Sequence, residues 1–236
     1  MSIAIASLAI LAALAGGTLL WWRARVEREM ALMVATKTST AREVAGMSPG
    51  SVVVLQGKLA TEAPLKGQFS GRDCIYYRVL VEREVRYDDA DTGADRFFDT
   101  VSSTEEHTTC RLEDASGSVP VDLTDAKVEA LQSHQHYVAG EAAAATGPAP
   151  KVRGTVLGHR YTEWIIPPGV PVYVLAAAGT GGVVGASPRR DYPFVVSCKS
   201  EKERLWSLDA TRLWLAVGAT ACFLVAAGLA IWSLAE

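Results

Sequence analysis

Charged side chains are missing from both ends of this chain. No Asp, Glu, Lys or Arg occurs in residues 1–22 or 213–235, although the 236 residues include 23 basic and 26 acidic ones. About 20 apolar residues in a helix span the hydrocarbon core of a bilayer, and each stretch reaches that length. Trp22, Trp214 and Trp232 stand near the ends of these stretches, where tryptophan rings favour the headgroup level. The absence of charge therefore predicts two transmembrane helices.

Cysteine is scarce, and the four cysteines include no Cys-x-x-Cys pair. Cys222 lies in the second apolar stretch, which leaves Cys74, Cys110 and Cys198 as an odd set. This pattern predicts no disulfide framework and is typical of a reducing compartment. A basic excess is also lacking, since the formal net charge is −3. Nucleic acid is therefore not a predicted partner.

Lys and Arg are concentrated on the inner flanks of the two apolar stretches. Arg23, Arg25 and Arg28 follow the first one, and four basic residues precede the second, at positions 199, 202, 204 and 212. Basic residues near membrane ends favour the cytoplasm. We therefore expect a multi-pass integral membrane protein with two spans, a cytoplasmic middle region and both termini outside. A cleaved signal peptide is the alternative for the first stretch, but no positive region precedes it. For the second stretch the alternative is a buried core helix.

The pattern of the middle region divides the chain into four parts. Residues 1–22 are the first transmembrane helix, 23–50 a helical juxtamembrane stalk, 51–205 a β-rich soluble domain, and 206–236 the second transmembrane helix. In the stalk, Ser39 or Thr40 is expected to cap a short helix that ends before Gly50.

Strand signals dominate residues 51–205. Residues 74–87 alternate with period two, the acidic segment 88–95 is expected to be a hairpin loop, and the strand after it should pair back. A turn at 114–117 joins two more strands, residues 124–140 suggest a loop with a helix, 141–154 a poorly ordered segment, and 179–185 a glycine-rich hairpin. Six to eight strands are expected. The predicted fold class is α+β, a β-rich antiparallel barrel or sandwich, OB-like in one version, between two transmembrane helices.

The order of four segments resembles the membrane-adjacent (BAM) domain of the GIDE family, mitochondria-anchored ubiquitin ligases with prokaryotic relatives. These segments are SGRDCIYYRVLVE, CRLEDASGSVPVDL, YTEWIIPPGVPVYVLAAA and FVVSCKSEKERLW. The sharpest elements run from Ser70 to Tyr77 and from Glu163 to Gly169. The residues that carry the resemblance are Ser70, Gly71, Cys74, Tyr76, Tyr77, Asp114, Gly117, Glu163, Ile166, Gly169 and Ser197.

The resemblance implies protein ubiquitination by an E3 ubiquitin ligase of the RING type. In the eukaryotic members ubiquitin transfer depends on a RING, which needs two sets of four Cys or His ligands beyond the second span. No such ligands follow that span before Glu236. The resemblance also implies a domain that faces the mitochondrial intermembrane space, whereas the flanking charges favour the cytoplasm.

Few residues suggest chemistry of their own. His107 and Cys110, together with His134 and His136, would offer four zinc ligands if their segments met; otherwise they are ordinary polar positions. Glu163 is expected to be a buried carboxylate that organises a turn, with a functional acid as the alternative. Cys74 suggests a small buried residue rather than a reactive thiol. Since Tyr76 and Tyr77 are adjacent, a strand would point them to opposite faces, one of them into the core.

The function predicted from these observations is a membrane-anchored GIDE-type binding or scaffold module, without a catalytic site or a cofactor. One alternative is a component of E3 ubiquitin ligase-type ubiquitination, and another is a metal-dependent membrane enzyme. The expected partners are the lipid bilayer, an unidentified protein and further copies of the chain. Small residues of the second span would mediate that homo-oligomer: Ala216, Gly218, Ala219, Ala227 and Gly228.

Overall fold

A computed structural model describes residues 3–89, 93–140, 154–187 and 192–235 of the chain. The chain forms two compact units: residues 1–37 with 199–236, and residues 38–198. The predicted flexible segment 141–154 lies outside the described residues except for Gly154, and so does the tip of the acidic loop, residues 90–92.

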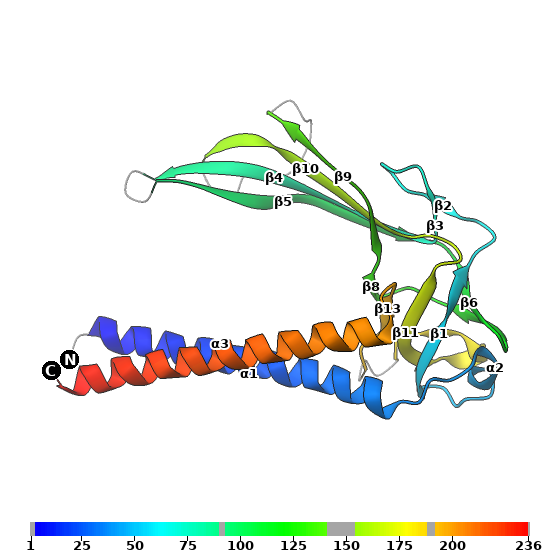
Figure 1. The fold of residues 1–236 in the computed structure, drawn as a ribbon, viewed down its shortest axis with the longest axis horizontal. Helices are drawn as coiled ribbons and strands as arrows, with labels where there is room; N and C mark the ends of the chain where they lie inside the picture. The colour runs from blue at the N-terminus through cyan, green and yellow to red at the C-terminus, as the bar shows by residue number, and fades with distance from the viewer. Residues whose placement is uncertain (1–2, 90–92, 141–153, 188–191, 236) are drawn as a thin grey trace. The chain divides into compact units, whose positions relative to one another are not determined.

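The first unit is a pair of long helices, α1 (Ile3–Ala35) and α3 (Glu201–Ala235), which run side by side (Figure 1). Glycines allow the close approach, because a Cβ at Gly16 would lie 3.0 Å from the Phe223 ring and one at Gly218 would lie 3.3 Å from Leu19. Residues 7–35 and 203–232 are long and apolar enough to cross a membrane. These two helices fit the membrane protein that the sequence predicts.

Helix α1 continues past its uncharged stretch to Ala35. Arg204 of α3 is only 1% exposed and forms an ion pair with Glu29 of α1. Such a buried pair fixes how two helices face each other, because either charge alone would be costly to bury.

The second unit begins with a capped turn of helix, α2 (Ala41–Val44). The Thr40 hydroxyl accepts from the Glu43 amide at 3.3 Å, and the Glu43 carboxylate accepts from the Thr40 amide at 2.7 Å. This reciprocal capping box satisfies backbone donors that a helix start leaves free. Of the two capping residues that the sequence suggests, the structure uses Thr40.

The core of the second unit is a closed five-stranded barrel. Its strands are β1 (Val52–Ala60), β6 (Cys110–Asp114), β7 (Gly117–Val121), β12 (Val184–Gly185) and β11 (Pro171–Ala178), and β11 pairs back with β1. All pairings are antiparallel except the parallel one between β7 and β12. Apolar side chains fill the interior, among them Val53, Leu55, Leu112, Val174 and Val196. The barrel confirms the OB-like version of the predicted fold.

Two short strands extend the barrel sheet beyond β11. β13 (Val195–Ser197) pairs antiparallel with β11, and β8 (Lys127–Glu129) pairs parallel with β13. The 3-10 turn η1 (Thr180–Gly182) joins β11 to β12, which agrees with the glycine-rich hairpin that the sequence predicts.

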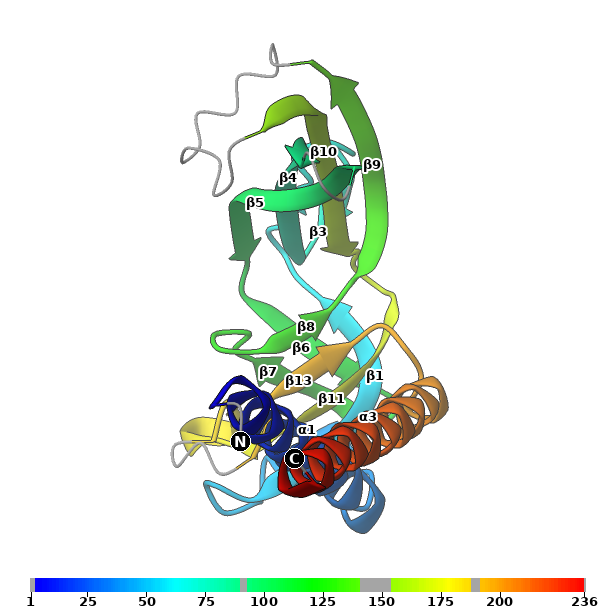
Figure 2. The same ribbon diagram turned by 90° about the vertical axis from the view of Figure 1, so that its left-hand side faces the viewer.

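A separate four-stranded antiparallel sheet is built from two segments of the chain that lie between barrel strands in the sequence. Its order is β5 (Gly93–His107), β4 (Tyr76–Asp89), β10 (Thr155–Ile166) and β9 (Leu131–Ala139), with β9 at one edge beside β10 (Figure 2). The hairpin of β2 (Leu65–Lys66) and β3 (Asp73–Cys74) precedes it. We call the face of this sheet that carries Glu163 and Tyr161 the inner face.

Several expectations are wrong in detail. The structure describes thirteen strands rather than six to eight, because many are only two to five residues long and leave little periodic signal. They form a barrel and a second sheet instead of one antiparallel unit. Residues 124–140 contain no helix; they form β8 and β9, since pairing with β13 and β10 outweighs the modest helix propensity of this segment.

Candidate binding site

A tight loop between β2 and β3 carries the first part of the site. The Gly67 amide donates to the Arg72 carbonyl at 2.9 Å, and the Gly71 amide donates to the Gly67 carbonyl at 3.0 Å. Gly71 has φ +64°, a conformation that glycine adopts at little cost. These bonds turn the chain so that the amides of Phe69 and Ser70 point at the sheet.

The carboxylate of Glu163, on β10, accepts hydrogen bonds from those amides. Its side chain is fully buried, and its carboxylate accepts hydrogen bonds from the Phe69 amide at 2.8 Å, the Ser70 amide at 3.2 Å and the Ser133 hydroxyl at 2.5 Å. Burial alone would raise the pKa of Glu163, but these bonds together hold the pKa below its usual value. Glu163 is therefore the turn-organising carboxylate that the sequence predicts.

Gly67 lies against that carboxylate. A Cβ at this position would come within 2.9 and 3.0 Å of the two Glu163 oxygens and 2.5 Å of the Ser70 hydroxyl. Only glycine leaves room for the loop to close over a buried carboxylate.

Four aromatic rings gather above Glu163 on the inner face. The His136 ring stacks on Tyr161 with centroids 4.7 Å apart and an interplanar angle of 4°. Phe69 lies 5.3 Å from His136, 5.7 Å from Tyr161 and 6.0 Å from His134. Phe69 remains 37% exposed, and both histidines are half-buried. We call these four residues the ring cluster.

Comparison with known proteins identifies the family. The family model described as GIDE, E3 ubiquitin ligase, matches residues 79–231, which is more than half of the chain. The chain belongs to the GIDE family. Its function is therefore E3 ubiquitin ligase-related. No curated protein and no solved structure matches. The GIDE match includes Glu163 and three members of the ring cluster, while Ser70 to Tyr77 and Phe69 lie before the matched residues.

The first GIDE-like element holds the sheet and barrel together. The Ile75 amide donates to the Ile166 carbonyl at 2.8 Å, joining the Ser70–Tyr77 element to the Glu163–Gly169 element. Tyr76 packs in the barrel core, and Tyr77 packs with Cys74 against the sheet. Both tyrosines are thus buried, where the sequence predicts only one in the core, because each face of this strand has its own apolar layer.

Tyr76, Tyr77 and Cys74 are held in their protonated forms. Tyr76 donates to Glu105 at 2.9 Å and Tyr77 to Glu106 at 2.5 Å, and burial and these carboxylates raise the pKa of both phenols. Burial, aided by the charge of Glu163, raises the pKa of the Cys74 thiol to about 11. Cys74 is therefore a buried, unreactive residue, as expected.

The remaining GIDE-like residues stand at turns and strand ends. Asp114 accepts from the Ala41 amide at 2.7 Å and from the Ser116 amide at 2.7 Å, so it links α2 to the β6–β7 turn, where Gly117 has φ +150°. Gly169, with φ +78°, donates its amide to the Leu59 carbonyl. Ser197 donates its hydroxyl to Glu129 at 2.9 Å. These positions maintain the fold.

The structure does not bring the two pairs of metal-ligand candidates together. His107 and Cys110 line a cavity of about 310 Å³ beside the barrel, and burial raises the pKa of the Cys110 thiol to about 12. His134 and His136 belong to the ring cluster. Among the described residues no group of three His, Cys, Asp or Glu side chains could hold a metal ion.

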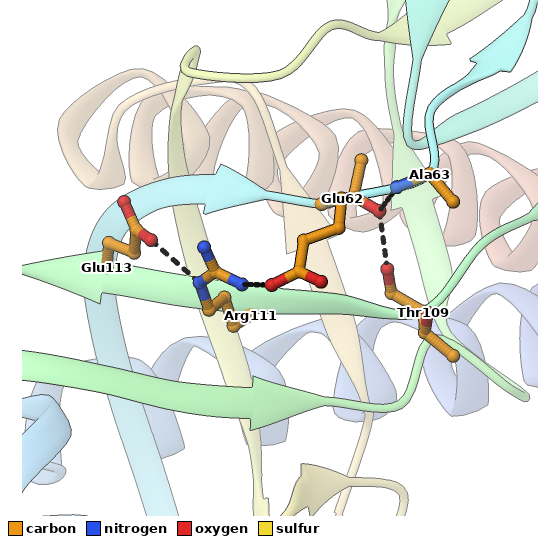
Figure 3. Close-up of polar contacts among 6 residues, drawn as sticks. Glu62, Ala63, Thr109, Arg111 and Glu113 are labelled. Carbon is orange, nitrogen blue, oxygen red and sulfur yellow. Dashed lines mark hydrogen bonds and ion pairs between the residues drawn. The ribbon is translucent and has the colours of Figure 1, made fainter.

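A second surface hollow lies at the end of β1. It has a volume of about 180 Å³ and is lined by residues 60–62 and 109–111. Figure 3 shows Arg111 between two carboxylates, with Glu62 at 3.2 Å and Glu113 at 2.8 Å. Because the charges of Glu62 and Arg111 balance each other among the residues that line it, this hollow offers little net charge to a ligand.

His159 gives the inner face a pH-sensitive position. It is 4% exposed, its Nδ1 atom has no hydrogen-bond partner among the described residues, and burial and the charge of Arg83 lower its pKa. The unfolded chain therefore binds a proton at a higher pH than the folded one, and stability is lost as pH falls through about 6.5.

We expect the thermal unfolding temperature of the wild type to fall between pH 7.5 and pH 5.5, and that of His159→Gln to fall less. Equal shifts in the two proteins would contradict the assignment.

Proposed function

We propose that this chain is a membrane-anchored binding module. It binds a protein partner at the ring cluster and acts in E3 ubiquitin ligase-related protein ubiquitination. The observation that carries the proposal is the exposed Phe69 ring on a loop held by a fully buried carboxylate. Exposed aromatic rings are the usual anchors of protein interfaces, and a rigid anchor loses little entropy on binding.

Polar side chains flank Phe69 in a way that suits an interface. Gln68 and Arg72, on the loop that carries Phe69, are both exposed. An apolar centre with a polar rim is the common anatomy of a protein-binding patch. The described part of β9 is also uncharged, so a partner meets no fixed charge along this edge.

Site-specific crosslinking in cells tests this proposal. A photoreactive phenylalanine analogue at Arg72 should give discrete crosslinked proteins, and Phe69→Ala should diminish them. The matched control carries the analogue at Ser118, which is also exposed but lies on β7 of the barrel. Identical products at both positions, or products insensitive to Phe69→Ala, would argue against binding at the ring cluster.

The GIDE match favours a second candidate, ubiquitin transfer promoted by the chain itself. The purified chain in lipid nanodiscs can be mixed with ubiquitin-charged conjugating enzyme. A binding module alone should leave the rate of ubiquitin discharge unchanged. A faster discharge would show instead that the chain itself promotes ubiquitin transfer.

We also propose that the domain faces the cytoplasm, since basic residues flank both spans on the inner side. A membrane-impermeant thiol reagent should label Ser118→Cys only after cells are opened. Burial raises the pKa of Cys74 and Cys198 to about 11, so the native thiols of the domain should react slowly and give a low background. Labelling in intact cells would place the domain outside.

A further inference from the structure

His134 and His136 form a close pair at the edge of the four-stranded sheet. One residue separates them on β9, so both side chains lie on the inner face. Their nearest ring nitrogens, Nε2 of His134 and Nδ1 of His136, are 3.1 Å apart. Both rings are half-buried, which leaves a path from solvent.

This separation suits two ligands of one metal ion. Histidine nitrogens bind zinc at about 2.0–2.1 Å, and two such bonds to nitrogens 3.1 Å apart enclose an angle of about 100°. That angle lies between the octahedral and the tetrahedral values, and both rings must turn from their hydrogen-bonded orientation to aim their lone pairs at one ion.

The surrounding structure holds both rings in place. Tyr161 stacks on His136, and Phe69 contacts both histidines. In the strand pairing His134 stands opposite Glu163 and His136 opposite Tyr161. The loop that carries Phe69 is in turn fixed by the Glu163 carboxylate. Ligands that are positioned before the ion arrives bind it more tightly.

Metal binding by the two histidines needs only a change of tautomer and no further reactant. In the metal-free pair one of the two facing nitrogens carries a hydrogen and the other accepts it. Metal binding needs a lone pair on both, so the donor ring changes tautomer and carries its hydrogen on its other nitrogen. Neutral rings release no net proton in this step.

We propose that His134 and His136 form a binding site for one late first-row divalent cation. Imidazole suits copper, nickel and zinc, and copper(II) is expected to bind most tightly. No third His, Cys, Asp or Glu side chain joins the pair within the described ranges, so water would fill the other positions. Two protein ligands predict an affinity on the order of micromolar, weaker than that of four-ligand sites.

Metal titration of the full chain in detergent, without a histidine tag, tests the site. We expect one Cu²⁺ per chain in calorimetry and an electron paramagnetic resonance spectrum with splitting from two nitrogens. His134→Gln and His136→Gln should each weaken binding by at least about tenfold. The matched controls are His107→Gln and His159→Gln, which replace the only other histidines of the chain.

Three results would overturn the proposal. They are saturation only in the millimolar range, an equal loss of affinity in the control variants, and a copper spectrum that stays the same in His134→Gln and His136→Gln. Circular dichroism of each variant, recorded without metal, separates a lost ligand from a lost fold.

Discussion

Replacing Glu163 by alanine is expected to lower the free energy of unfolding of the domain by about 3–5 kcal/mol. Three donors then lose their acceptor at a buried site, and hydrogen bonds to a charged group each contribute about 1.5–3 kcal/mol. A domain of this kind is stable by only about 5–15 kcal/mol, so the loss is a large fraction of the total. Denaturant unfolding of the purified variant measures it.

Glu113→Ala is the matched control for this prediction. Glu113 also accepts a hydrogen bond, from Arg111, but it lies on the exposed surface of β6. Surface ion pairs contribute at most about 1 kcal/mol. A similar destabilisation in both variants would show that Glu163 does not hold the loop as described.

The low pKa of Glu163 also predicts how its contribution to folding stability changes in acid. Because its folded pKa is held below the usual 4.5, its contribution is complete above that value and is lost as pH falls through the folded pKa. The stability difference between the wild type and Glu163→Gln should therefore shrink below pH 4.5.

A second large effect is expected at the ion pair of Arg83 and Asp99. The pair joins β4 to β5 at 2.7 Å, and its side chains are only 8% and 3% exposed. Asp99→Ala leaves the guanidinium buried without this carboxylate, which should cost about 3–5 kcal/mol. Unfolding in urea, monitored by tryptophan fluorescence, measures this cost.

The double variant Arg83→Met with Asp99→Leu tests the reason for that cost. Apolar side chains of similar volume remove the buried charge together with its partner, and such replacements are often neutral or stabilising. We expect the double variant to be more stable than Asp99→Ala alone. A double variant that is less stable than Asp99→Ala would show that packing rather than charge dominates at this position.

Local signals in the sequence account for much of this fold. The uncharged ends, the long alternating strand and the turn at 114–117 each depend on neighbouring residues, and each is present in the structure. The role of Glu163 was also predictable, because a carboxylate between apolar residues of a strand must find donors when it is buried.

Other features depend on partners that are distant in the chain. Nothing near Phe69 indicates that His136 and Tyr161 will lie against it, since the contacts join a loop to strands more than sixty residues away. For the same reason the helix expected in 124–140 is wrong: only pairing with β10 and β13 makes this segment extended. Ser70 and Glu163 belong to the two GIDE-like elements, but the sequence does not show that they touch each other or that Gly67 lies against both.

The pairing that closes the barrel has a consequence for synthesis of the protein. Val53 of β1 pairs with Ala176 of β11, so the first barrel strand must wait for more than a hundred further residues. At roughly 5–20 residues per second the ribosome needs on the order of 6–24 s to make them. During that time β6 can pair with Lys58–Ala60 of β1, but the edge of β1 that belongs to β11 has no partner, and a nascent chain in this state is a natural client for chaperones.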